Sequence, residues 1–135
     1  MLRIRDIVID ALDPPALARF WAAALHGYAV RPYDEAEVAR LAVLGRTPET
    51  DPAVAIDGPG PTLFIQETTQ PKVARNRVHL DLMGGARAEE VARLCALGAS
   101  VRDERDTFSV LRDPEGNEFC VLDPERAAQE PPRGG

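Results

Sequence analysis

The chain has 135 residues, enough for one domain with a core of its own. Its formal net charge is -6, from 16 basic and 22 acidic residues. This balance argues against nucleic acid or an anionic membrane as a partner, because phosphate binding needs clustered positive charge. No apolar run reaches the roughly eighteen residues of a membrane span. Two cysteines make no disulfide framework, and the N-terminus lacks the apolar stretch of a signal peptide, so we expect a cytoplasmic protein.

The first half of the chain opens with a predicted strand and helix. Residues 2–10 alternate as a strand does, and Asp13 followed by proline is typical of a helix N-cap and first helical residue. Gly27 fits the residue just past the helix end. The helix carries an apolar stripe formed by Leu17, Phe20, Trp21, Ala24 and Leu25. Because Trp21 belongs to this stripe, we expect it in the core.

Three more strands are predicted in this half, at residues 28–33, 53–56 and 62–66. Between the first two, Asp34 followed three residues later by glutamate indicates a short capped helix, which Gly45 ends. The connection between the last two strands is rich in glycine and proline, as a turn would be.

The second half opens with a strictly alternating stretch, residues 76–82. Its apolar residues fall on one face of a strand, whereas Arg77, His79 and Asp81 fall on the other. Such a polar face is typical either of a strand half exposed to water or of the wall of a wet cavity. A helix is predicted next, over residues 87–97.

The remaining strands are predicted over residues 99–102, 108–111 and 118–122. The sequence Asp113-Pro114-Glu115-Gly116 is a strong turn signal before the last of them. Residues 123–135 have no apolar pattern, and we expect a disordered C-terminal tail there.

The predicted order of elements occurs twice, as strand, helix and three strands. Residues 17–27 resemble residues 91–98, which supports a duplication. The sequence therefore predicts an α+β fold for residues 1–122, with two βαβββ modules at about 1–67 and 76–122. We expect the modules to pack about a pseudo-twofold axis and form a cupped mixed sheet, with the extra short helix in the first module.

Three sequence motifs resemble a known superfamily. They are Asp-Pro-x-x-Leu-Ala-Arg-Phe-Trp-x-x-x-Leu at 13–25, Pro-Lys-x-x-x-Asn-Arg-x-His-Leu-Asp at 71–81, and Asp-Pro-Glu-Gly-Asn-Glu-Phe-Cys-Val-Leu at 113–122. With the duplication, they resemble the vicinal oxygen chelate superfamily, and within it the glyoxalase-like domains of actinobacterial type. The superfamily includes glyoxalase I, extradiol dioxygenases, epimerases, fosfomycin-modifying enzymes and bleomycin-binding resistance proteins. The resemblance is specific for fold and not for reaction.

The resemblance also implies positions for metal ligands, because metal-dependent members take them from the first and last strands of each module. The matching residues here are Asp6, Gln66, His79 and Cys120. Only His79 is the residue type that a typical member has at its position. Gln66 is a weak ligand, and Cys120 favours a soft ion such as zinc. We read this mixed set as a metal site that is absent, so no cofactor is favoured and a divalent metal is the alternative.

Strand parity extends the candidate site to further residues. The concave surface of the cup is predicted to present Asp6, Asp10, Phe64, Gln66, Arg77, His79, Asp81, Glu118 and Cys120. Aromatic surface combined with a few converging polar groups suits a small-molecule site, and we expect Phe64, Gln66, Arg77, Asp81 and Glu118 to bind substrate. For Arg77, Asp81 and Glu118 the alternative is a set of internal salt bridges that only hold the sheet together.

His79 is the candidate catalytic residue, because an imidazole beside carboxylates can shuttle a proton near neutral pH. The alternative is a hydrogen-bonded structural histidine. Cys120 would be a nucleophile if His79 lies across the cavity from it, and otherwise a small apolar filler.

These observations lead to three hypotheses. The first is a protein that binds or transforms a small polar organic molecule without the usual divalent metal, either as an enzyme or by sequestering its ligand. The second is a metal-dependent lyase, isomerase or dioxygenase with the atypical ligand set. The third is a partner-binding module without chemistry. Because members of the superfamily commonly form dimers, we expect a homodimer.

Overall fold

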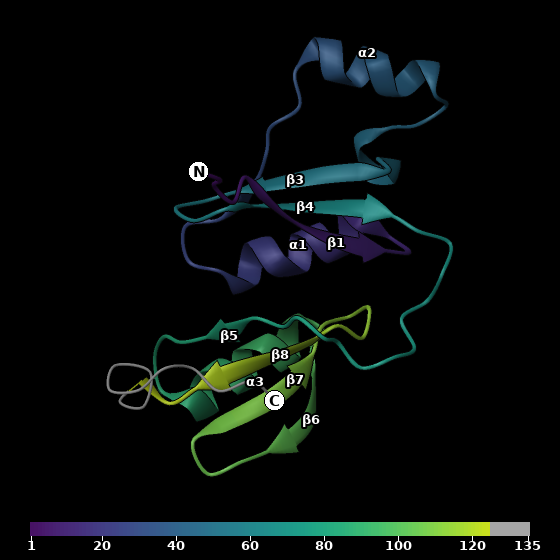
Figure 1. Cartoon of the computed structure of the whole chain (residues 1–135). Coiled ribbons are helices and arrows are strands. Elements are labelled where there is room, and N and C mark those ends of the chain that lie inside the picture. Colours follow the sequence, from purple (N-terminus) through teal and green to yellow (C-terminus); the bar gives the residue numbers. More distant parts are fainter. Residues whose placement is uncertain (125–135) are drawn as a thin grey trace. The chain divides into compact units, whose positions relative to one another are not determined.

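The computed structural model describes residues 1–124, and the predicted tail lies outside them except for its first two residues. The chain divides into two compact units, Met1–Pro71 and a second that begins at Lys72, and each is described by itself (Figure 1). None of the helices in the described residues is both long and apolar enough to cross a membrane.

The first unit contains one four-stranded mixed sheet. Its elements are β1 (Asp6–Ala11), α1 (Pro14–Ala24), β2 (Ala29–Val30), α2 (Glu35–Val43), a 3-10 turn (Pro48–Thr50), β3 (Ala53–Asp57) and β4 (Thr62–Glu67). The strand order is β1-β4-β3-β2, and only the β1–β4 pair is parallel. α1 packs on β3 and β4. The extra helix that the sequence predicts in this module is α2.

The second unit repeats this topology. Its elements are β5 (Asp81–Leu82), α3 (Arg87–Leu97), β6 (Ser100–Glu104), β7 (Phe108–Arg112) and β8 (Glu118–Leu122). The strand order is β5-β8-β7-β6. As in the first unit, only one pair is parallel, and it joins the edge strand β5 to β8. The predicted α+β fold of duplicated βαβββ modules is therefore confirmed. One cup shared by the two sheets stays a prediction.

α1 forms for the reasons that its sequence indicates. The Asp13 carboxylate accepts a hydrogen bond from the Ala16 N–H at 3.3 Å, and prolines occupy the start of the helix. Leu17, Phe20 and Trp21 are buried, and the Phe20 and Trp21 rings meet edge to face with centroids 5.3 Å apart. The prediction that Trp21 belongs to the core is confirmed.

Two strands of the first unit are shorter than predicted. β1 begins at Asp6 and not at residue 2, because its partner β4 begins only after Pro61, which has no N–H for the ladder. β2 spans two residues instead of 28–33. The Arg31 N–H still donates to the Ala55 carbonyl, but Pro32 cannot extend the pattern.

The predicted opening strand of the second module is wrong over residues 76–80, and only Asp81–Leu82 is strand. Val78, on the apolar face of the predicted strand, is 81 % exposed. The Asn76 N–H donates to the Glu118 carboxylate at 3.0 Å, and the Asn76 side-chain amide donates to the Val78 carbonyl at 3.3 Å. The side chains of Glu118 and Asn76 thus bond backbone groups that a neighbouring strand would bond in a β-ladder.

A buried carboxylate anchors the segment that carries α2. The Tyr33 hydroxyl donates to Asp51 Oδ2 at 2.5 Å, and the Ala53 N–H donates to Asp51 Oδ1 at 2.9 Å. Asp51 is only 3 % exposed. Burial, with this hydrogen bond, raises the pKa of Tyr33 well above its ordinary value. The contact therefore fixes the chain on both sides of α2.

We expect Tyr33→Phe to lower the free energy of unfolding by about 1–2 kcal/mol, because Asp51 Oδ2 loses its donor inside the protein. Urea denaturation measures the change. The control is Tyr28→Phe, which removes a hydrogen bond from a hydroxyl to the neutral Pro61 carbonyl at 3.0 Å. Its expected cost is about 0.5–1 kcal/mol, so equal losses for the two variants would contradict the role given to Asp51.

Candidate functional site

The predicted site residues are divided between the two units. Asp6, Phe64 and Gln66 belong to the first unit, and Arg77, His79, Asp81, Glu118 and Cys120 belong to the second. Each group is therefore described within its own sheet.

In the first unit, the strand register separates two of the residues that the resemblance implies as metal ligands. β1 and β4 pair Asp6 with Thr62, Val8 with Phe64 and Asp10 with Gln66. Asp6 and Gln66 are thus four positions apart along the sheet, roughly 13 Å at ~3.3 Å per residue. Two ligand atoms of one ion lie within about 4.5 Å of each other. The structure therefore does not bring Asp6 and Gln66 together as ligands of one ion.

In the second unit, three predicted residues do come together. β5 and β8 pair Asp81 with Cys120, and His79 lies two residues before Asp81. His79 Nε2 is 3.5 Å from Asp81 Oδ1, and one ligand atom from each of His79, Asp81 and Cys120 lies within 4.8 Å of the other two. Although most of the predicted strand is absent, the placement of His79 beside Asp81 is retained.

Asp81 is the electrostatically unusual member of this group. Burial raises the pKa of the Asp81 carboxyl above its ordinary value, against the opposing effects of the His79 charge and a hydrogen bond from the Cys120 side chain. Asp81 Oδ1 is buried and accepts no hydrogen bond within residues 1–124, although it lies 3.5 Å from His79 Nε2. The arrangement can pass a proton between an imidazole and a carboxyl group, and its three side chains are all potential metal ligands.

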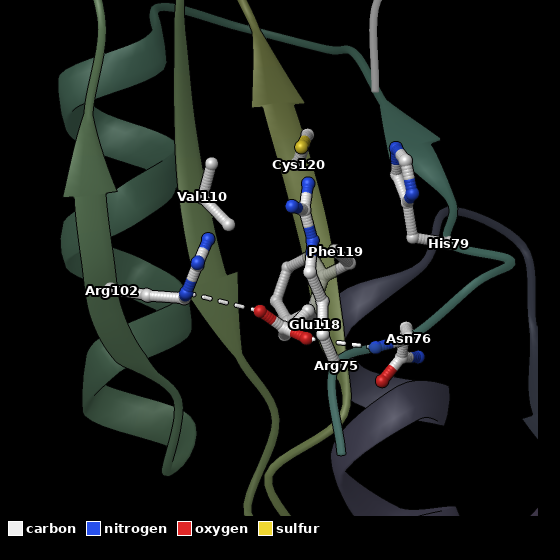
Figure 2. Close-up of a pocket in the computed structure, with 8 residues that line it drawn as sticks. All are labelled: Arg75, Asn76, His79, Arg102, Val110, Glu118, Phe119 and Cys120. Carbon is white, nitrogen blue, oxygen red and sulfur yellow. Dashed lines mark hydrogen bonds and ion pairs between the residues drawn. The ribbon is translucent and has the colours of Figure 1, made fainter. Parts of the chain in front are cut away.

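Glu118, at the start of β8, holds the segment before β5 against the sheet. Its carboxylate accepts the Asn76 N–H at 3.0 Å and forms an ion pair with Arg102 at 3.0 Å (Figure 2). It forms a second ion pair with Lys72 at 3.5 Å. The Asn76 hydrogen bond lowers the pKa of Glu118 below its ordinary value, with help from the two cations and against burial. Glu118 therefore makes the internal salt bridges that were the alternative to substrate binding.

Figure 2 shows a pocket that is lined in part by Glu118 and Cys120 of β8. Its volume is about 10 Å³, space for roughly one water molecule. The lining residues are Arg75, Asn76, His79, Arg102, Val110, Glu118, Phe119 and Cys120. The exposed Arg77 is not among them, and the structure does not bring it to this pocket.

Sequence reasoning missed two cations of this pocket. Arg75 belongs to the connector before β5, where no periodicity marked a face. Arg102 lies on β6, and its ion pair with Glu118 reaches across the intervening strand β7. The carboxylate of Glu118 in the predicted cup was the available signal, because a buried carboxylate needs a cationic partner.

The duplicated βαβββ fold is the fold of the vicinal oxygen chelate superfamily. Residues 6–122 match the model of the glyoxalase-like domain family. Because the match covers most of the chain, the protein belongs to the glyoxalase-like domain family. A search of curated proteins found no significant match.

Several solved structures share the fold of this chain. The trypanothione-dependent glyoxalase I of Leishmania major is 17% identical, with a TM-score of 0.62 over 96% of this chain and 91% of that one. A glyoxalase/bleomycin resistance protein/dioxygenase family enzyme from Burkholderia phytofirmans PsJN is 15% identical, with a TM-score of 0.62 over 89% and 97%. A glyoxalase/bleomycin resistance protein from Albidiferax ferrireducens T118 is 21% identical, with a TM-score of 0.52 over 87% and 95%. At these identities the likeness concerns the fold alone.

Proposed function

We propose that this protein binds or transforms a small polar organic molecule, and that His79 contacts the ligand. The observation that carries the proposal is the placement of the His79 imidazole 3.5 Å from the Asp81 carboxylate, at a pocket with both charged and apolar walls. A histidine in this setting can take a proton from a ligand or give one to it.

The pocket limits how a ligand enters. With a volume of about 10 Å³, it accepts one functional group and not a whole organic molecule. Arg75, Arg102 and Asn76 carry N–H groups that can donate to a ligand oxygen, while Val110 and Phe119 provide apolar contact. The proposed ligand is therefore a small molecule with an oxygen group that accepts hydrogen bonds, such as a carboxylate or a phenolic oxygen.

The proposal does not use the four-residue metal set implied by the family resemblance. It is supported by the register of β1 and β4, which separates Asp6 from Gln66. Roles for Phe64, Gln66 and Arg77 in ligand binding stay predictions. We also propose a homodimer, the assembly that members of the superfamily commonly form, and a domain of the actinobacterial type, which the motif at residues 71–81 resembles. A cytoplasmic location stays a prediction.

The chain offers a direct test because it has two histidines, His26 and His79. Small carboxylates and catechol are added to chelator-treated protein while the two imidazole NMR signals are followed. We expect saturable shifts of the His79 signal, with the signal of the exposed His26 unchanged. His79→Gln is expected to weaken binding by about 10-fold, the effect of losing roughly 1.4 kcal/mol of contact energy.

His26→Gln is the matched control and is expected to leave the affinity unchanged. Compounds that bind without moving the His79 signal, or that bind the His79→Gln variant as tightly as the wild type, would place the ligand elsewhere. No response to any of these compounds would count against the proposed class of ligand.

A further inference from the structure

The spacing of His79, Asp81 and Cys120 matches that of metal ligands. Their ligand atoms all lie within 4.8 Å of one another, and the His79 Nε2 to Asp81 Oδ1 distance is 3.5 Å. Two ligand atoms each about 2.0 Å from a tetrahedral ion are separated by roughly 3.3 Å. Side-chain adjustments of about 1 Å would therefore bring the three atoms into one coordination sphere.

The three donor types also select a class of ion. A thiolate, an imidazole and a carboxylate together are typical of zinc, whereas magnesium and calcium prefer oxygen ligands alone. A metal-free cluster is the competing explanation. In such a cluster the buried Asp81 Oδ1 accepts no hydrogen bond within residues 1–124 and lies 3.5 Å from His79 Nε2. A bound cation would satisfy this oxygen.

The neighbouring pocket has the size that a fourth ligand requires. His79 and Cys120 both line it, and its volume of about 10 Å³ corresponds to one water molecule. Three protein ligands with one exchangeable position are the arrangement of catalytic zinc sites, whereas structural zinc sites use four protein ligands.

We propose that His79, Asp81 and Cys120 bind one divalent ion of the zinc class, with a water in the fourth position. All three ligands come from β5, the residues just before it, and β8, so the site requires neither Asp6 nor Gln66. It differs from the four positions implied by the family resemblance because Asp81, and no residue of the first unit, completes the protein ligands. When bound, such an ion polarises a ligand oxygen or lowers the pKa of its water.

The test uses the full chain after treatment with a chelator. It is titrated with Co²⁺, which reports its ligands through absorption, and then with Zn²⁺ in competition. We expect one equivalent of Co²⁺ to bind with a thiolate-to-metal charge-transfer band and tetrahedral d–d bands. Zn²⁺ should displace the Co²⁺ stoichiometrically, whereas Mg²⁺ in large excess should not.

Substitutions then identify the ligands. Cys120→Ser should remove the charge-transfer band, and His79→Gln and Asp81→Asn should each weaken Co²⁺ binding by more than about 10-fold, the smallest effect ascribed to groups that only support a ligand. The matched controls are Cys95→Ser, His26→Gln and Asp103→Asn. Cys95 is the chain's other cysteine and is exposed, so its replacement should leave the band intact.

Three results overturn the proposal. The first is Co²⁺ binding by the wild-type protein without a thiolate band, and the second is no Co²⁺ binding at all. The third is an unchanged affinity in Asp81→Asn, a variant of the same shape. Both readouts concern the metal alone, and the ligand test under the proposed function uses metal-free protein. Failure of the metal site is therefore distinguishable from failure of organic-ligand binding.

Discussion

Replacing Glu118 by alanine is expected to lower the free energy of unfolding by about 3 kcal/mol, and Glu118→Gln by about 2 kcal/mol. The carboxylate is 9 % exposed and interacts with Arg102, Lys72 and the Asn76 N–H. Loss of one partner of a fully buried ion pair costs about 3–5 kcal/mol. A smaller loss of stability is expected here because both cations retain access to water. Glutamine keeps an acceptor for the Asn76 N–H and loses only the charge.

Urea denaturation of the variants measures this effect, with Asp103→Asn as the control. Asp103 pairs with Arg105 at the surface, so its replacement should cost less than about 0.5 kcal/mol. Because the folded-state pKa of Glu118 is lowered, its charge stabilises the protein above its ordinary pKa of 4.5, and this stabilisation is lost as the pH falls through the folded-state value. The difference between wild type and Glu118→Gln should therefore shrink below about pH 4.5. A difference that stays constant down to pH 3 would contradict the ionic role.

The fold could be predicted because its signals are local and occur twice. The stripe of α1 and the turn Asp113–Gly116 each specify an element through their own residues. The helix predicted at 87–97 and the strand at 118–122 match α3 and β8 residue for residue. Strand periodicity failed at Asn76–Leu80 because a distant carboxylate on β8 binds the backbone there, and no local pattern encodes such a contact.

The candidate site was predictable only in part for the same reason. His79 and Asp81 share a face by their spacing, and Cys120 lies beside them because β5 pairs with β8 in a parallel register. Register between strands far apart in sequence depends on where each strand begins, which is also why the separation of Asp6 from Gln66 could not be foreseen. The cations around Glu118 come from two different segments and required the three-dimensional structure.

A buried carboxylate, Asp113, holds the turn before β8 through several hydrogen bonds. Asp113 is 3 % exposed, and its Oδ1 accepts the N–H groups of Glu115 at 2.9 Å and Asn117 at 3.0 Å. Its Oδ2 accepts the side-chain amide of Asn117 at 3.0 Å. One buried carboxylate thus holds the turn as far as Asn117. β8 begins at the following residue, Glu118. The first and third residues of β8, Glu118 and Cys120, therefore depend on this turn for their position.

Asp113→Ala is expected to lower the free energy of unfolding by about 3 kcal/mol, since two N–H groups and an amide lose an ionised acceptor at a buried position. Asp113→Asn keeps the shape and one acceptor oxygen, so about 1–1.5 kcal/mol is expected. Gly116→Ala is the control for backbone strain alone. Gly116 has φ of 90° with open space around the position of a Cβ, and about 1 kcal/mol is expected. Equal losses for alanine and asparagine at position 113, measured by urea denaturation, would show that the carboxylate charge does not hold the turn.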